Sequence, residues 1–293
     1  MSNIFSLINL DEEFYRINNK DLKNLSTFDL KNHYFNFGYF EGRPSSKIAI
    51  KENFIKTLNK EADKKSILEI SPFNNPLMVG KNVKYAEILP KDKLIERAVE
   101  LKLEVNKIPN IDYIISSHSL ESITEKFNII FASHVIEHQP DLITHLNEVS
   151  SKLIDGGIYA LILPNAKYCF DANLPFSKIS DVINAFIDKR KLHTLGSIIE
   201  HRALTTHNDP FRHWTEKKSI LYKPIDVDKV SSAIEEFKNS SNQYIDVHAF
   251  QFDPMTFSDI LNTLIKLKLI NFSSIEVNGP VFSSFDFTLI MKK

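Results

Sequence analysis

From residue 66 onward, short apolar runs alternate with segments whose apolar residues recur at helical spacing. The apolar runs are rich in β-branched residues, which predicts strands at 67–70, 83–87, 111–115, 127–132 and 158–163. Helical spacing between the last two runs appears at Leu142, Ile143, Leu146, Val149 and Leu153. Gly156-Gly157 is expected to end this helix. Strands that alternate with helices predict an α/β fold with a mostly parallel sheet, which places ligands at the carboxyl ends of its strands.

The N-terminal part of the chain has a different pattern. Residues 1–62 carry only short helical patterns, with Asp11 and either Ser26 or Thr27 as candidate N-caps. We therefore expect a small helical N-terminal module, followed by a larger domain over residues 63–293.

A polar stretch also interrupts the larger domain. Residues 165–243 contain four of the ten histidines and show no alternation of strands and helices, so they are predicted as an insertion after the fifth strand. The pattern resumes with a helix near 255–268 and strands around 272–277 and 285–291. A helix followed by two closing strands predicts an antiparallel last strand at the edge of the parallel sheet.

Composition narrows the classes of protein that remain. The 293 residues carry a net charge of −1, so no basic field indicates a nucleic-acid partner. The N-terminal residues lack the basic region of a signal peptide and no apolar run reaches the length of a membrane span, so we expect a cytoplasmic protein. The single cysteine, Cys169, excludes an internal disulfide and a multi-cysteine zinc site. The seven glycines form no dinucleotide fingerprint, Walker loop or hydrolase elbow.

The segment from Phe127 to Pro164 contains the densest group of motifs. After the expected strand it reads Ala132-Ser133-His134 and Val135-Ile136-Glu137-His138, with Pro140-Asp141 before the expected helix and Gly156-Gly157 after it. This order resembles the central block of class I S-adenosylmethionine-dependent methyltransferases.

Two further motifs extend the resemblance over roughly residues 66–293. Residues 67–70 with Asn75-Pro76 resemble the first motif of that family, and Tyr85-Ala86-Glu87 resembles its second. The resemblance implies a Rossmann-like methyltransferase sheet and S-adenosylmethionine as the cofactor.

Within that family, the sequence resembles a bacterial branch associated with surface-polysaccharide gene clusters. Residues 33–44 also resemble a short helical module found ahead of bacterial glycan enzymes. These resemblances imply methylation of a sugar hydroxyl in a capsule or lipopolysaccharide precursor. The expected partner is thus a small-molecule or glycan-precursor substrate, and a homo-oligomer is compatible with the sequence.

The resemblance places the cofactor along the ends of the first, second, third and fourth strands. Glu87 lies 18 residues after Glu69, close to the offset of about 20 at which a nucleotide-binding unit holds its ribose-binding acid. Glu69 is expected to orient the first turn or to meet the methionine amine through water. The full set of candidate cofactor contacts is Glu69, Ser71, Asn74, Pro76, Glu87, Ile88, Ser116, Ser133 and His134.

Two loops depart from the family pattern. The turn after the first strand has no glycine, and Ser71 adds a side chain where the family has none. Asn tolerates positive φ, so we expect Asn74 or Asn75 to replace one glycine conformationally. The loop Ser116-Ser117-His118 lacks the carboxylate that commonly holds the adenine amine in this family.

Methyl transfer to a hydroxyl needs an aligned acceptor and a group that accepts the hydroxyl proton. Histidine suits the second task because its ordinary pKa is near neutral. The candidate catalytic residues are His138, His201 and His248, with Asp246 orienting an imidazole or the sugar.

Two other classes of function remain as alternatives. A degenerate methyltransferase fold that binds glycans or acts as a scaffold is the first, because of the altered cofactor loops. A metal-dependent hydrolase using the histidine-rich insertion is the second. His134 to His138 spells the inverted zinc-peptidase motif, but a strand before it and Pro140 after it argue against the continuous helix that this motif needs. His201, His207 and His213 are six residues apart and would not share one helical face, so no metal ligands are assigned.

Overall fold

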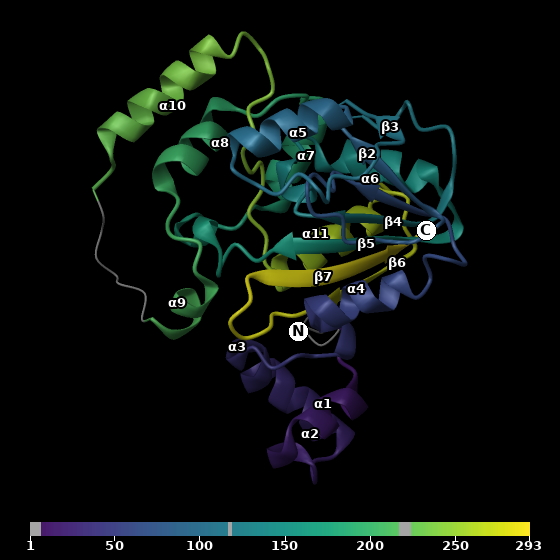
Figure 1. Cartoon of the computed structure of the whole chain (residues 1–293). Coiled ribbons are helices and arrows are strands. Elements are labelled where there is room, and N and C mark those ends of the chain that lie inside the picture. Colours follow the sequence, from purple (N-terminus) through teal and green to yellow (C-terminus); the bar gives the residue numbers. More distant parts are fainter. Residues whose placement is uncertain (1–6, 117–118, 217–223) are drawn as a thin grey trace.

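The computed structural model describes residues 7–116, 119–216 and 224–293 and contains a seven-stranded sheet in the order β3-β2-β1-β4-β5-β7-β6 (Figure 1). The strands are β1 (Ile67–Ile70), β2 (Val83–Glu87), β3 (Tyr113–Ile114), β4 (Phe127–Ser133), β5 (Leu153–Pro164), β6 (Ser274–Asn278) and β7 (Asp286–Lys292). Each of the seven predicted strands is present. Strands β3, β2, β1, β4 and β5 pair in parallel, and β7 pairs antiparallel with both β5 and β6. The predicted Rossmann-like methyltransferase sheet with an antiparallel last strand is therefore confirmed.

Helices cover both faces of this sheet. The N-terminal helices are α1 (Glu12–Asn18), α2 (Thr27–His33), α3 (Tyr39–Glu41) and α4 (Lys51–Asn59), with 3₁₀ or π turns at Lys20–Leu22, Tyr34–Gly38 and Lys47–Ala49. The later helices are α5 (Lys91–Glu100), α6 (Leu142–Lys152), α7 (Ile179–Ile187), α8 (Leu195–Ile199), α9 (Pro210–Thr215), α10 (Val227–Asn239) and α11 (Pro254–Lys266). The later 3₁₀ or π turns are Ile136–His138, Phe170–Asn173 and Glu200–Leu204. Asp11 and Ser26 cap α1 and α2 as predicted, each accepting a backbone N–H.

The alternation of side chains along β4 explains the two hydrophobic layers. Ile130 and Ala132 face the cluster that includes α6 and α11, whereas Ile129 and Phe131 face the cluster that includes α4. Because both faces are covered, the strand is apolar throughout. Helix α4 thus packs directly on the sheet, although it lies within residues 1–62; the boundary at residue 62 stays a prediction.

The connection between β1 and β2 contains no helix among its described residues, 71–82. Parallel strands are usually joined by a crossover helix, which would cover this part of the sheet. Here α4 occupies that face, and its Asn59 side chain donates to Leu77 O and accepts from Val79 N, both at 2.8 Å. A helix that precedes the sheet in sequence therefore supports the loop that follows β1.

The glycine pair after α6 lies elsewhere than predicted. Helix α6 ends at Lys152, and Gly156 and Gly157 lie within the irregular start of β5, so the prediction that they end the helix is wrong. The pairing of β4 with β5 shifts register between Phe127 and Ile129, and Gly156 has φ +77° at this irregularity. Such a bulge favours glycine because the extra residue takes a left-handed conformation.

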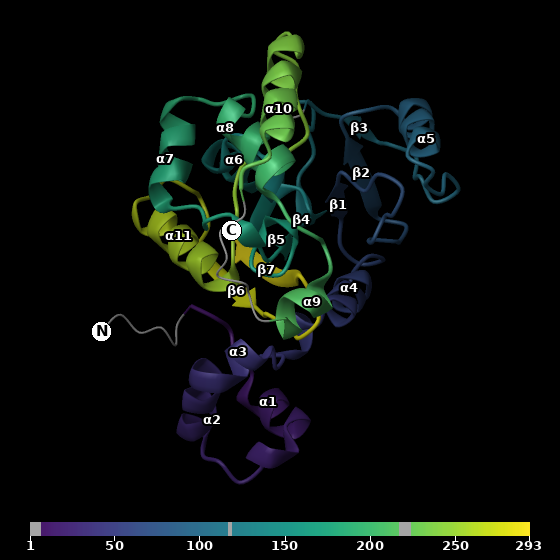
Figure 2. The same cartoon turned by 90° about the vertical axis from the view of Figure 1, so that its left-hand side faces the viewer.

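Contacts with the end of the sheet hold the N-terminal module in place, below the sheet in Figures 1 and 2. Tyr34 Oη donates to Gly279 O at 3.2 Å, and Phe282 N donates to Gly42 O at 2.8 Å. Gly42 has φ +70°, and a Cβ at this position would lie 2.5 Å from Phe282 N. Glycine is therefore required here both by conformation and by close approach.

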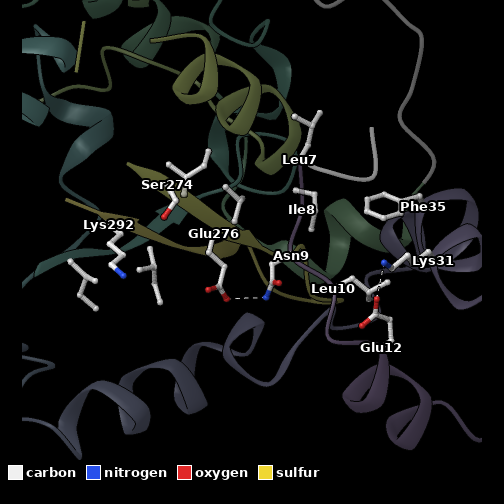
Figure 3. Close-up of a pocket in the computed structure, with 14 residues that line it drawn as sticks. Leu7, Ile8, Asn9, Leu10, Glu12, Lys31, Phe35, Ser274, Glu276 and Lys292 are labelled. Atoms are coloured by element: carbon white, nitrogen blue, oxygen red, sulfur yellow. Dashed lines mark hydrogen bonds and ion pairs between the residues drawn. The ribbon is translucent and has the colours of Figure 1, made fainter. Parts of the chain in front are cut away.

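A hollow of about 500 Å³ follows the seam between this module and β6 (Figure 3). The side chain of Asn9 crosses the seam and donates to Glu276 Oε1 at 2.9 Å and Asn278 Oδ1 at 3.0 Å. On the module side, Lys31 pairs with Glu12 at 2.9 Å. These contacts join the module to the sheet edge, and none of the predicted site residues lies here.

The predicted insertion forms α7 to α10 beyond the carboxyl end of β5, toward which the β5 arrow points in Figure 1. Helix α10 projects from the end of the molecule opposite the N-terminal module in both views (Figures 1 and 2). The chain then returns through residues 244–249, where Ala249 N donates to Glu137 O at 2.7 Å. None of the described helices has the length and apolar character needed to cross a membrane.

Candidate functional site

A cavity of about 600 Å³ lies at the carboxyl ends of β1, β2 and β4. This is the size of an ordinary small-molecule site, and the place is where sheets of this kind bind ligands. Its wall contains Ser71, Phe73, Glu87, Ile88, Leu89, Leu94, Arg97, His134, Val135, His138, Gln139, Tyr244 and Asp246. Six of the predicted site residues therefore meet in one cavity: Ser71, Glu87, Ile88, His134, His138 and Asp246.

The turn after β1 takes left-handed backbone conformations at two residues without glycine. Ser71 has φ +54° and Phe73 has φ +45°, whereas Asn74 and Asn75 do not have positive φ, so the expectation that an asparagine replaces the glycine is wrong. Ser71 N donates to Ala86 O at 2.8 Å, and Phe73 N donates to Glu87 Oε1 at 2.9 Å. These two contacts with β2 fix the turn, which explains why the strained residues differ from those that propensity favours.

We expect Ser71→Gly to raise the free energy of unfolding by about 0.5–1 kcal/mol. A left-handed conformation costs a residue with a side chain about 1–2 kcal/mol, and the greater freedom of glycine in the unfolded chain offsets part of this gain. Asn75→Gly in the same turn is the matched control and should lower stability slightly, because Asn75 has no positive φ. Urea denaturation measures both. Equal effects of the two substitutions would contradict the assigned strain.

The two predicted acids of the first strands both hold backbone amides. Glu87 is 4% exposed; its Oε1 accepts from Phe73 N and its Oε2 from Ile88 N, at 2.9 and 3.0 Å. Burial raises the pKa of Glu87, while the two amides and Arg97 oppose this. Because each carboxylate oxygen has more than one acceptor position, Glu87 can still accept hydroxyl groups from the cavity.

Glu69 lies behind the cavity rather than in its wall. Its carboxylate accepts from Leu77 N and Met78 N at 2.9 Å. Burial raises the pKa of Glu69 to about 7. Its hydrogen bonds are thus made with the loop after β1, and both of its predicted roles stay predictions.

The other predicted cofactor contacts lie outside the cavity wall. Asn74 donates to Glu104 O at 3.3 Å, and Pro76 lies farther along the same loop. Ser133 is the last residue of β4. Ser116 lines a neighbouring hollow of about 560 Å³, and Ser117 and His118 are outside the described residues. Their roles as cofactor contacts stay predictions.

The four predicted catalytic residues lie together, with His138 and Asp246 in the wall of the cavity. His138 Nδ1 lies 3.0 Å from Asp246 Oδ1, and the His138 and His248 rings are 4.6 Å apart. His248 N lies 3.3 Å from His201 Nδ1, to which it donates. Asp246 also pairs with Arg97 at 3.5 Å and so links the returning segment to α5. Burial lowers the pKa of His201 to about 4, and contact with His138 lowers that of Asp246 to about 2.

His134 occupies a strained position at the end of β4, with φ +55°. Its Nε2 lies 2.8 Å from Asp286 Oδ1, and Asp286 Oδ2 in turn pairs with Lys51 at 2.8 Å. Burial opposes protonation of the imidazole, but Asp286 and Glu137 outweigh it and raise the pKa of His134 to about 9. The end of β4, the start of β7 and helix α4 thus meet at a charged contact beside the cavity.

The backbone around His134 and His138 has the geometry that argues against an inverted zinc-peptidase site. Strand β4 runs to Ser133 and only a 3₁₀ turn follows at Ile136–His138, so no continuous helix carries His134 and His138. Elsewhere, the rings of His207 and His213 stack at 4.0 Å because they lie on a loop and a separate short helix rather than on one helix.

The structure adds site residues that the sequence did not single out. Glu137 lies 1% exposed between His138 and His248, and Asp171 Oδ2 lies 2.6 Å from His248 Nδ1. Tyr244 and Arg97 line the cavity. The Val-Ile-Glu-His motif contained a signal for Glu137, whereas Asp171 stands in the insertion without a motif.

No family model matches the chain, and no curated protein matches it. Among solved structures, the CurJ carbon methyltransferase is 12% identical over 83% of this chain, and an S-adenosylmethionine-dependent methyltransferase from Mesorhizobium loti is 11% identical over 82%; each has a TM-score of 0.40. The glycopeptide N-methyltransferase MtfA, solved with the S-adenosylmethionine analogue sinefungin, is 16% identical over 38% of this chain at a TM-score of 0.28. The matches cover 52%, 96% and 53% of those three chains, so this chain spans about half of the first and the last. Identities and TM-scores this low leave function to be inferred from the site itself.

Proposed function

We propose that this protein is an S-adenosylmethionine-dependent methyltransferase that acts on a hydroxyl group. The observation that carries the proposal is the buried carboxylate of Glu87 in the wall of a cavity at the carboxyl ends of β1, β2 and β4. A carboxylate at the end of the second strand is suited to accept the two hydroxyls of a ribose, as in other nucleotide-binding sheets.

The rest of the wall also fits an adenosine with an amino-acid tail. Ile88, Leu89, Leu94 and Val135 offer apolar surface for a base beside Glu87. The left-handed backbone at Ser71 reproduces the conformation for which the family uses glycine, so the turn can approach a ligand despite its side chain. When bound, the cofactor would supply an activated methyl group.

We assign binding of the methyl acceptor to the group formed by His138, His201, His248 and Asp246. His138 lies in the cavity wall, and Asp246, His201 and His248 adjoin it, so the acceptor hydroxyl can be oriented there and its proton accepted. The resemblance of the sequence to the surface-polysaccharide branch favours a sugar hydroxyl in a glycan precursor. We also infer a cytoplasmic location, where such precursors are activated.

A second candidate is a non-catalytic methyltransferase fold that binds a glycan or a protein partner. The observation in its favour is the loop 71–82, which has no crossover helix. That loop would offer the methionine end of a cofactor fewer backbone amides than a helix N-terminus.

Calorimetry with S-adenosylhomocysteine and the full chain, in buffer with EDTA, separates these candidates. We expect one site with micromolar affinity, and no binding of ATP, because the cavity has no glycine loop that holds phosphates. Absence of binding at millimolar S-adenosylhomocysteine would overturn the enzyme assignment and favour the second candidate. Transfer of a labelled methyl group to a panel of sugars and phenols then tests the acceptor class.

A further inference from the structure

Glu137 carries a buried charge that the described residues leave without a hydrogen bond. It is 1% exposed, and neither of its carboxylate oxygens accepts a hydrogen bond within the described parts of the chain. An ionised carboxylate in such a place costs several kcal/mol unless a cation or donors compensate for it. The nearest basic group is the imidazole of His134, whose Nδ1 lies 3.4 Å from Glu137 Oε1 without the geometry of a hydrogen bond.

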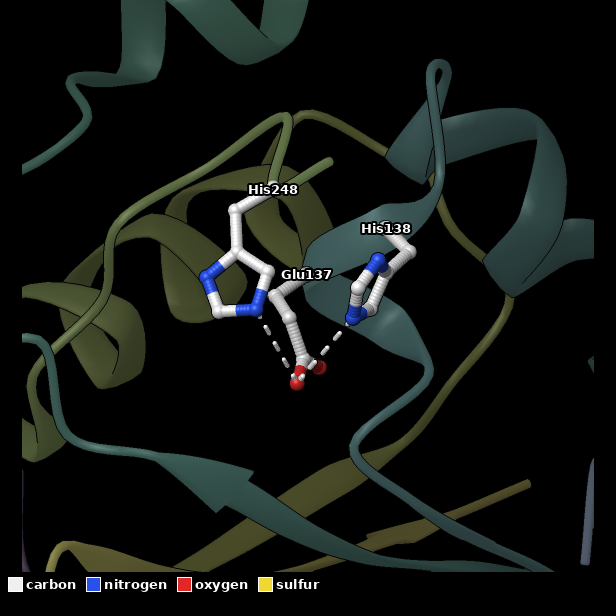
Figure 4. Close-up of side chains that lie close together, drawn as sticks. All are labelled: Glu137, His138 and His248. Atoms are coloured by element: carbon white, nitrogen blue, oxygen red, sulfur yellow. Dashed lines mark ion pairs between the residues drawn. The ribbon is translucent and has the colours of Figure 1, made fainter. Parts of the chain in front are cut away.

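Two further imidazoles, those of His138 and His248, present a nitrogen to this carboxylate (Figure 4). His138 Nε2 lies 3.9 Å and His248 Nε2 lies 4.0 Å from Glu137 Oε1, and the three candidate ligand atoms all lie within 4.8 Å of one another. The distances are too long for hydrogen bonds. They are slightly longer than the separations of roughly 3–3.5 Å that ligand–metal bonds of about 2.0–2.2 Å allow, so small side-chain rotations bring them to bonding distance.

The far side of each imidazole meets a carboxylate. His248 Nδ1 lies 2.6 Å from Asp171 Oδ2, and His138 Nδ1 lies 3.0 Å from Asp246 Oδ1. Because Asp171 accepts a hydrogen bond from His248 Nδ1, Nε2 of that ring is left unprotonated and directed at the centre, which is the usual arrangement of a histidine that binds a metal. The contact of His138 Nδ1 with Asp246 is an ion-pair contact without hydrogen-bond geometry. Two imidazoles, each with a carboxylate on its far side, are thus directed at the carboxylate of Glu137.

We propose that Glu137, His138 and His248 bind a divalent transition-metal ion such as Zn²⁺, Mn²⁺ or Fe²⁺. Two imidazoles and one carboxylate suit these ions, whereas Ca²⁺ and Mg²⁺ prefer oxygen ligands throughout. Three protein ligands leave at least one coordination position open.

The open coordination position gives the metal ion a role in the proposed methyl transfer, and this role rests on the proposed function. His138 belongs to the wall of the cofactor cavity, so the ion lies where the acceptor must approach. A metal-bound hydroxyl loses its proton more readily, and the ion also orients the acceptor oxygen. In this arrangement His138 and His248 act as ligands, and the metal ion takes over the activation assigned above to an imidazole base.

The test uses the full chain, stripped with EDTA and titrated with Co²⁺ and then with Zn²⁺. We expect one Co²⁺ per chain, with visible absorption bands that Zn²⁺ removes. Glu137→Gln and His248→Ala should weaken binding at least 100-fold, and Asp171→Asn about 10- to 100-fold, because it orients a ligand. His207→Ala is the control, since His207 stacks on His213 outside this cluster, and it should bind like the unmodified protein.

Crystals of the unmodified protein soaked in Zn²⁺ give a readout that does not depend on the folding of variants. An anomalous peak between Glu137, His138 and His248 is expected. A peak elsewhere only, absence of saturable Co²⁺ binding, or unchanged binding by the Glu137→Gln and His248→Ala variants would overturn the proposal. Metal binding is measured without cofactor, and cofactor binding is measured in EDTA, so failure of one proposal is distinct from failure of the other.

Discussion

Glu87→Ala should weaken the binding of S-adenosylhomocysteine at least 100-fold. The substitution removes both oxygens that would accept the ribose hydroxyls, and a hydrogen bond to a charged group contributes about 1.5–3 kcal/mol. It also leaves Phe73 N and Ile88 N without their present acceptor, so the turn after β1 loses one of its two contacts with β2. The loss of 100-fold corresponds to about 2.7 kcal/mol of binding free energy.

Calorimetry measures this effect, and two further variants identify its cause. Glu87→Gln keeps the size of the side chain and one acceptor oxygen, so we expect a loss of about tenfold. Glu276→Ala is the matched control, because this half-buried carboxylate on β6 accepts from Asn9 outside the cavity wall. It should leave affinity within about twofold of the unmodified protein. Equal losses in Glu87→Ala and Glu276→Ala would show a general loss of folding rather than a lost ribose contact.

The sheet was predictable because its signal is local and repeated. Strands β1 and β4 and the second half of β5 are buried on both faces, and this requirement appears directly as nearly continuous apolar sequence. The role of α4 was not predictable in the same way. Its position over the β1–β2 connection depends on tertiary packing of Phe54 and Leu58 against Ile67 and Met78, which no pattern within either segment specifies.

The site residues also fall into those that the sequence predicts and those that depend on tertiary contacts. Glu87 ends one predicted strand, and His134 and His138 follow another, so the topology alone brings them together at the carboxyl ends of the strands. The strain at Ser71 and Phe73 was missed because contacts with β2, rather than the propensity of Asn74 or Asn75, determine which residues are left-handed. Asp171 was missed because only the folded insertion brings it to His248.

When the pH falls from 6.5 to 4, the buried imidazole of His145 should lower the free energy of unfolding by about 3 kcal/mol. This imidazole is buried in α6, its Nε2 lies 2.9 Å from Tyr159 Oη, and burial lowers the pKa of His145 from 6.5 to about 4. As the pH falls below 6.5 the unfolded chain takes up a proton that the folded chain does not, so the unfolded state gains stability until the pH reaches about 4. The difference between 6.5 and about 4 corresponds to about 3 kcal/mol.

Urea denaturation at a series of pH values, compared between variants, isolates this contribution. Burial also lowers the pKa of His193 and His201 to about 4, so the unmodified protein loses stability from several groups at once. His145→Gln keeps a hydrogen-bonding group beside Tyr159 without a titrating ring, and should lose about 3 kcal/mol less than the unmodified protein over this range. Tyr159→Phe removes the hydrogen bond but leaves the imidazole buried, so it should keep the full pH dependence. A His145→Gln variant that loses as much stability as the unmodified protein would show that this imidazole already accepts a proton in the folded core, where α6 packs on β5.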